Sequence, residues 1–80
     1  MDNKINVENW DYFSVMDQKY YGGSSHPLRL SNGLVIQVIR NGTQSGHFGT
    51  YSVEVRERTD LDKQYLSANE ANTYIESISL

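Results

Sequence analysis

The clearest pattern of apolar positions lies near the C-terminal end of the chain. Four of these positions share the i, i+3, i+4, i+7 spacing of one helix face, and they are Ala71, Tyr74, Ile75 and Ile78. Ser67 and Glu70 occupy the two ends of a capping box, in which each side chain bonds the backbone N–H of the other residue. The pattern therefore predicts a helix over 68–77 with Ser67 as its N-cap.

A second pattern, in which apolar and polar residues alternate, begins at Tyr51 and runs to Arg58. Tyr51, Val53 and Val55 fall on one side of this alternation, which predicts a half-buried strand over 50–58. The residues between this strand and the helix form a polar turn, and a short strand over 64–66 is expected just before the helix cap.

The run over 34–39 is apolar at every position except Gln37. Such a run is typical of a central strand that is covered on both faces, or covered on one face and open to a partner on the other. We expect this strand over 34–40 and a neighbouring strand over 27–31. Asn32-Gly33 between them predicts a tight hairpin with a type I′ turn, because both residues tolerate positive φ.

The N-terminal segment is ambiguous. Its apolar residues lie near helical spacing, Asn6 is a suitable cap and Gly22-Gly23 would end a helix, so a helix over 7–19 is slightly favoured. The β-forming residues over 12–16 predict a strand instead. In either form the segment is expected to cover the second face of the sheet or one of its edges.

These elements predict an α+β fold: an antiparallel sheet of three or four strands with the C-terminal helix packed on one face. At 80 residues the chain corresponds to one small domain over 1–80. It has no cysteine, which excludes disulfides, thiolate metal sites and a thiol nucleophile. The N-terminal residues are polar and no apolar run approaches the length of a membrane span, so a cytoplasmic protein is expected.

Catalytic and cofactor sites find little support. His26 and His47 lie apart in predicted loops without further metal ligands, and Ser45 beside His47 lacks an orienting acid. The glycine clusters lack the lysine of a phosphate-binding loop, so turns explain them. We therefore expect no enzymatic activity, no metal and no cofactor.

The net charge of −3 is unevenly distributed, because the arginines fall in the predicted sheet and the carboxylates near both ends. Nucleic-acid binding would use the four arginines Arg29, Arg40, Arg56 and Arg58, of which the last two share the outer strand face. The acidic total opposes such binding. Four carboxylates around the predicted helix could instead imitate nucleic-acid phosphates, and these are Asp60, Asp62, Glu70 and Glu76.

Aromatic side chains outside the predicted core are the remaining candidates for binding a partner. Phe48 lies in the predicted loop over 41–49, where packing onto the core is slightly favoured over presentation to a partner. The pair Tyr20-Tyr21 before Gly22-Gly23 poses the same choice. Tyrosine is a favoured interface anchor because it buries a large area at a low entropy cost.

In its general build the chain resembles the small anti-CRISPR and other anti-defence proteins of phages and mobile elements. The shared features are a cysteine-free acidic domain, an antiparallel sheet and one capped helix, over about residues 27–80. The resemblance implies an inhibitor that binds a larger host protein or ribonucleoprotein complex. The expected contacts are Tyr20, Tyr21, Phe48, Asp60, Asp62, Glu70 and Glu76. A small nucleic-acid-binding or regulatory domain and a homodimer that pairs through its sheet face remain alternatives.

Overall fold

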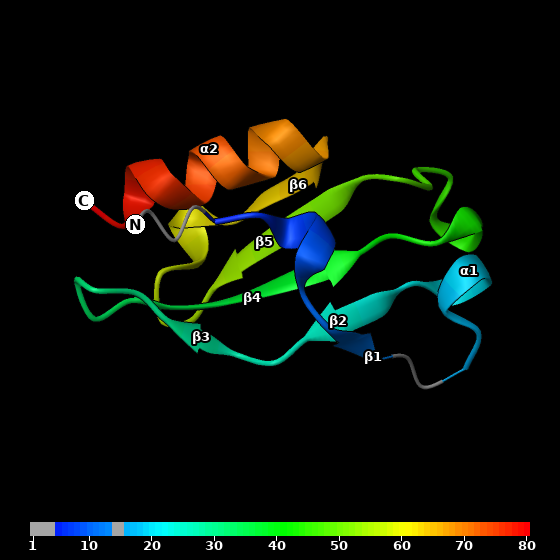
Figure 1. The fold of residues 1–80 in the computed structure, drawn as a ribbon, viewed down its shortest axis with the longest axis horizontal. Coiled ribbons are helices and arrows are strands. Elements are labelled where there is room, and N and C mark those ends of the chain that lie inside the picture. The colour runs from blue at the N-terminus through cyan, green and yellow to red at the C-terminus, as the bar shows by residue number, and fades with distance from the viewer. Residues whose placement is uncertain (1–4, 14–15) are drawn as a thin grey trace.

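The computed structural model describes residues 5–13 and 16–80, and it shows an antiparallel sheet with one long helix against it (Figure 1). The strands are β1 (Tyr12–Phe13), β2 (Gly23–Ser25), β3 (Leu28–Arg29), β4 (Val35–Arg40), β5 (Tyr51–Val55) and β6 (Lys63–Leu66). The helices are α1 (Gln18–Tyr21) and α2 (Ala68–Ile78), and the short 3-10 helices are η1 (Val7–Asn9), η2 (Thr43–Ser45) and η3 (Thr59–Leu61). The strand order is β1-β2-β4-β5-β6, with β3 also paired to β4. The fold is α+β as predicted, but the sheet has six strands rather than three or four.

The core lies between the central strands and α2. Ile36 pairs with Val55 and Val38 with Val53 across β4 and β5, and all four side chains are at most 1% exposed. Each such burial contributes about 1.5–3 kcal/mol to stability. The central strand predicted over 34–40 is thus confirmed.

The helix α2 begins at the predicted capping box. The Ser67 Oγ accepts the Glu70 N–H at 3.2 Å, and the Glu70 carboxylate accepts the Ser67 N–H at 2.9 Å. Ala71 and Ile75 on the predicted apolar face are fully buried. The predicted helix is therefore confirmed, with one further residue at its end. Within the described ranges, no helix has the length and apolar character needed to cross a membrane.

The N-terminal segment is not the continuous helix favoured over 7–19. It forms η1, then β1, and then α1 after residues 14–15, which lie outside the described part of the chain. The Val7 N–H donates to Asn72 Oδ1 at 2.8 Å, and the Tyr12 hydroxyl donates to the Val7 carbonyl at 2.6 Å. The second bond occupies a carbonyl that a helix over 7–19 would bond to the N–H four residues later. The alternative prediction, an extra strand over 12–16, agrees with β1 at Tyr12–Phe13.

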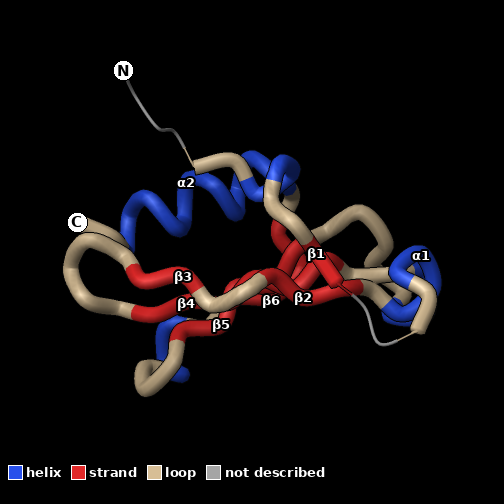
Figure 2. The backbone as a smooth tube through the Cα atoms, turned by 60° about the horizontal axis from the view of Figure 1, so that its bottom comes forward, coloured by secondary structure: helices blue, strands red, loops and turns tan. Residues whose placement is uncertain are grey.

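The short helix η1 lies on the same face of the sheet as α2 (Figure 2). Val7 of η1 belongs to the core cluster with Ile75, while β1 extends one edge of the sheet. The prediction that this segment covers the second face is therefore wrong, and its alternative, an edge position, is right for β1. On that second face, Val35 and Ile39 of β4 are half-buried and lie outside the core cluster.

The hairpin between β3 and β4 forms where predicted, but its turn type differs. The Leu30 N–H donates to the Leu34 carbonyl and closes a three-residue loop. Within this loop Gly33 has φ 96°. Asn32 does not adopt the positive φ that a type I′ turn requires of both central residues. Its side chain instead donates to the Ile78 carbonyl at 2.7 Å, which ties the hairpin to the end of α2.

The strand predicted over 27–31 is shorter than expected, because β3 covers only Leu28–Arg29, and β2 before it was not predicted. Pro27 between these strands has no N–H to offer a neighbour. At the end of β2 the chain stays bonded to β4 through Ser25. Its Oγ accepts the Val38 N–H at 3.0 Å, and its carbonyl accepts a bond from Gln37 Nε2 at 3.0 Å. The predicted strand is therefore present as β3 alone, and β2 is an additional strand on the same neighbour.

The strand predicted over 50–58 ends at Val55. Glu57 has φ 68°, which is incompatible with an extended strand. Asp62 then accepts the Val55 N–H through its carboxylate at 2.7 Å and closes the turn. The short strand predicted before the helix is confirmed as β6.

Candidate functional site

Most of the large apolar side chains that the protein exposes gather at one end of the sheet. Of the eight that are exposed among the described residues, six lie at this end: Phe13, Met16, Tyr20, Tyr21, Phe48 and Tyr65. The strand register places them together, because β2 begins, β4 ends and β5 begins at this end, with Arg40 paired to both Gly23 and Tyr51. These six residues define the aromatic end.

The structure brings three of the predicted contact residues to the aromatic end. Tyr20 and Tyr21 lie in the short helix α1 rather than in a loop, and both are exposed. Phe48 is 57% exposed, so the slightly favoured packing onto the core is wrong. Contact between these three residues and a partner stays a prediction.

The helix α1 is capped and tied to β1 by side chains at its N-terminal end. Asp17 caps it, with Oδ1 accepting the Lys19 N–H at 2.9 Å. The Gln18 Nε2 donates to the Tyr12 carbonyl at 2.9 Å. A helix of four residues is not stable on its own, so these contacts fix the positions of its tyrosines.

The two segments that carry Tyr20 and Phe48 meet through glycine. Figure 1 shows α1 beside η2 at the end of the sheet. A β-carbon on Gly42 would lie 2.4 Å from the Gly22 nitrogen and 2.6 Å from the Tyr20 carbonyl carbon. Only glycine permits backbones to approach so closely, and the two segments are therefore locked together.

Side-chain hydrogen bonds and a ring stack order the loop that presents Phe48. The Ser45 Oγ accepts the His47 N–H at 3.0 Å, and the Thr50 hydroxyl donates to the His47 carbonyl at 2.6 Å. The His47 ring stacks on Tyr65 with 3.7 Å between centroids. A surface that is ordered before binding loses less conformational entropy when a partner arrives.

A hollow of about 290 Å³ opens on one side of the aromatic end. Phe13, Met16 and Tyr21 line it together with Ser24 and Ile39, and no charged residue does. Such a lining suits a bulky uncharged side chain of a partner.

The arginines do not assemble into one basic patch. Since β5 ends at Val55, the predicted sharing of a strand face by Arg56 and Arg58 is wrong, and both lie on the following turn. Arg58 pairs with Asp60 at 3.0 Å, and this hydrogen bond lowers the pKa of the Asp60 carboxyl. Arg40 lies at the opposite end of β4 from this turn.

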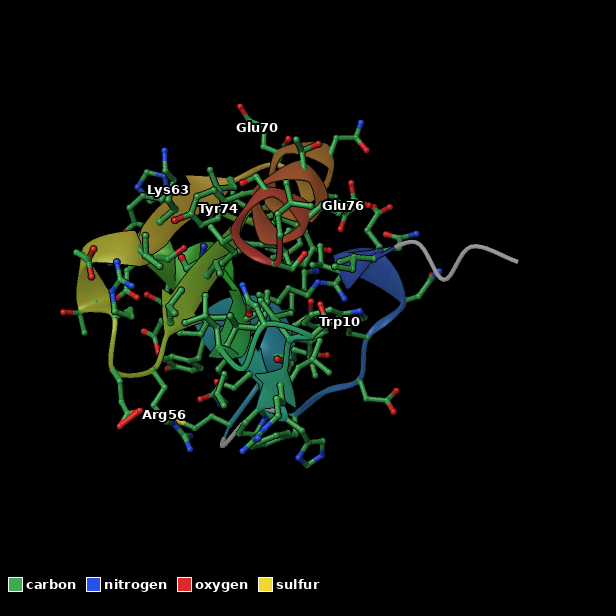
Figure 3. All side chains as sticks on the ribbon, turned by 90° about the vertical axis from the view of Figure 1, so that its left-hand side faces the viewer. Trp10, Arg56, Lys63, Glu70, Tyr74 and Glu76 are labelled. Atoms are coloured by element: carbon green, nitrogen blue, oxygen red, sulfur yellow. The ribbon has the colours of Figure 1, made fainter. Side chains whose placement is uncertain are left out.

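The four predicted acidic contacts are also dispersed. Asp60 and Asp62 lie on the turn at the end remote from Tyr20, where one pairs with Arg58 and the other bonds a backbone N–H. Figure 3 shows Glu70 and Glu76 on α2, on the far side of the molecule from Arg56. The structure therefore separates Asp60 and Asp62 from Tyr20, and it gives Asp60, Asp62 and Glu70 local structural roles.

Two half-buried tyrosines have pKa values above the ordinary tyrosine value. Burial is the largest cause for Tyr12, and the neighbouring Tyr51 adds to it. Burial is also the largest cause for Tyr74, whose hydroxyl donates to the Leu61 carbonyl. The Lys63 ammonium lies 5.4 Å from the centroid of the Tyr74 ring. Both hydroxyls are thus bonded to backbone carbonyls of the fold.

The histidines and Ser45 form no catalytic arrangement. The His26 ring lies 5.0 Å from that of Phe13, and the Ser45 hydroxyl bonds backbone groups instead of the His47 imidazole. In the part of the chain that the structure describes, no three His, Asp or Glu residues lie close enough to hold a metal ion.

Comparisons with protein-family models, with curated proteins and with solved structures find no match to this chain. The candidate site therefore depends on its own geometry. Phe13, Met16 and Tyr65 were not predicted as part of it. For Phe13 a signal was available in the sequence. Adjacent residues of a strand face opposite sides, so a strand over 12–16 would place Phe13 on the side opposite to its neighbours.

Proposed function

We propose that this protein is a non-enzymatic inhibitor that acts by binding a larger protein or ribonucleoprotein complex through the aromatic end. One observation carries the proposal: six large apolar side chains are exposed at one end, on segments locked together by glycine contacts and hydrogen bonds. A few anchored aromatic side chains supply most of the binding energy in many protein interfaces.

The composition of the aromatic end favours a protein surface as the partner over a nucleic-acid backbone. Its hollow is uncharged, and the nearby charged residues Asp17, Lys19 and Arg40 nearly balance. Binding to phosphates requires clustered cations, whereas protein interfaces are enriched in aromatic residues and methionine.

The class of partner comes from the resemblance to phage-borne anti-defence proteins. The proposed partner is a bacterial nucleic-acid-targeting defence complex in the host cytoplasm, which the inhibitor blocks at a nucleic-acid groove or at a conformational change. The net charge of −3 supports this choice, because it favours approach to a basic groove.

Co-purification from a CRISPR-bearing host tests the proposal. The tagged protein should recover subunits of an effector complex, and the double variant Tyr20→Ser, Phe48→Ser should not. Leu80→Ser is the matched control, because it removes a fully exposed apolar side chain outside the aromatic end. Recovery of no effector component, or equal recovery by the double variant, would overturn the proposal. Salt-sensitive binding of the purified protein to DNA or RNA would also count against it.

A further inference from the structure

The outer edge of β3 is an open edge of the sheet. The strand β3 pairs with β4, whereas β1 pairs only with β2, where Tyr12 lies opposite Ser25. Phe13 lies opposite Ser24 and is therefore further along the sheet from β3 than Tyr12 is. Within the described part of the chain, no strand lies beside the outer edge of β3 (Figure 1). We call this edge the β3 edge.

Arg29 presents its backbone N–H and carbonyl to the β3 edge. Hydrogen-bonded and non-bonded pairs alternate along an antiparallel ladder. The Leu30 N–H donates to the Leu34 carbonyl at 2.7 Å, so the adjacent pair, Arg29 with Val35, is a non-bonded one. The Val35 carbonyl agrees with this assignment, because it accepts the Arg56 N–H on the β5 side of β4. Both backbone groups of Arg29 therefore point away from β4, toward any strand that arrives at the edge.

The side chains of β3 give the edge two further points of contact, one on each face of the sheet. Arg29 is exposed, and among the residues that the structure describes its guanidinium has no carboxylate partner. Adjacent strand residues face opposite sides, so Leu28 lies on the other face, where it is 39% exposed. A strand at this edge would therefore meet a cation on one face and an apolar side chain on the other.

A hollow of about 370 Å³ lies beside Leu28. One of its walls is the segment 9–11, which includes the half-buried Trp10, and the other is the segment 25–28. The apolar groups of Trp10 and Leu28 suit an apolar side chain. Asp11 also lines the hollow, and its carboxylate disfavours an acidic side chain there. An acidic residue of a partner is therefore favoured at Arg29 and an apolar residue at the hollow.

We propose that an extended segment of a partner protein adds to the β3 edge as an antiparallel strand, with an acidic residue opposite Arg29 and an apolar residue directly after it. The acidic residue and Arg29 exchange both of their backbone hydrogen bonds. Its carboxylate pairs with the guanidinium, because residues opposite one another share a face of the sheet. The apolar residue lies opposite Leu28 and fills the hollow. Main-chain bonds thus supply affinity, and alternate side chains supply specificity.

The bounds of the edge limit the partner to a short segment. Pro27 on one side has no N–H to donate, and the turn over 31–33 ends the strand on the other side. Only a few backbone bonds can form over this length, so the contacts at Arg29 and at the hollow are both needed for binding. The unpaired guanidinium selects an acidic segment over a basic one.

Selection from a phage-displayed library of random peptides tests the proposal on the intact chain. The wild-type protein should enrich peptides in which aspartate or glutamate is followed directly by a large apolar residue. Arg29→Glu should replace the acidic preference with lysine or arginine at the same position. Arg56→Glu is the matched control, because it makes the same change in charge on the other side of β4 and should leave the preference unchanged. The absence of an enriched motif, or a motif that Arg29→Glu leaves unchanged, would overturn the proposal.

Synthetic peptides of the selected sequence test strand addition itself in an NMR titration, in which the Arg29 amide signal should shift. N-methylation of the acidic residue removes the N–H that the Arg29 carbonyl accepts, so it should weaken binding by at least about tenfold. N-methylation of the apolar residue that follows should have little effect, because its N–H points away from β3. Equal effects of the two methylations would overturn strand addition. Tyr20→Ser, Phe48→Ser should leave peptide binding intact, so this proposal and the proposed inhibition can fail independently.

Discussion

The backbone of Gly42 packs so closely on that of Gly22 that a β-carbon at position 42 would lie 2.4 Å from the Gly22 nitrogen. This contact joins the segments that carry Tyr20 and Phe48, and it is made by backbone atoms that cannot rotate away. The arrangement of the aromatic end therefore depends on two residues that contribute no side chain to it.

Replacing Gly42 with alanine should disrupt the aromatic end. The added methyl group meets backbone on several sides, so the expected cost is about 3 kcal/mol, or a fall in Tm of roughly 10 °C or more. Thermal unfolding followed by circular dichroism measures it. Gly46→Ala is the control, because nothing lies within 4 Å of its β-carbon and only its positive φ of 76° costs about 1 kcal/mol. Equal losses in the two variants would contradict the contact.

Asn72→Ala should release the N-terminal segment from α2. The buried Val7 N–H would lose its acceptor, at an expected cost of about 1–3 kcal/mol. Urea unfolding measures the loss, and hydrogen exchange at the Val7 amide should accelerate. Asn69→Ala on the exposed side of the same helix is the control and should be neutral. Unchanged exchange at Val7 would show that the bond does not hold the segment.

Stability should fall at alkaline pH because of Tyr12. Burial raises its pKa in the folded state, so its contribution is fully present below the pKa of an unfolded tyrosine, which is about 10. Above that pH the unfolded chain ionises first, and the contribution is lost as pH rises toward the folded-state pKa. Tm measured between neutral and strongly alkaline pH should decline, and Tyr12→Phe should decline less steeply. The variant should also lose about 1 kcal/mol at neutral pH with the Val7 bond. An identical slope in both proteins would rule Tyr12 out as the cause.

Local signals in the sequence predicted the parts of the fold that depend on local interactions. The capping box of Ser67 and Glu70 acts within one helical turn, and the alternation from Tyr51 to Val55 reflects one buried face. The helix prediction was confirmed, and the strand prediction was confirmed from Tyr51 to Val55 but not over its last three residues. The N-terminal segment was mispredicted because its form depends on Asn72, which is 65 residues from Val7.

The aromatic end could be predicted only in part for the same reason. Tyr20, Tyr21 and Phe48 stood out as candidates, but their proximity depends on the strand order and on the contact between Gly22 and Gly42. The prediction that Arg56 and Arg58 share a strand face was wrong because a positive φ at Glu57 ends β5. A glutamate rarely adopts this conformation, so the sequence does not predict it.

A plasmid-interference assay in a CRISPR-bearing host that expresses the protein tests the central claim most directly. We predict that the wild-type protein and Leu80→Ser restore transformation by a targeted plasmid, and that Tyr20→Ser, Phe48→Ser does not despite folding normally. Restoration by the double variant at the wild-type level would contradict binding through the aromatic end. Failure of the wild-type protein to restore transformation would contradict the inhibitory function itself.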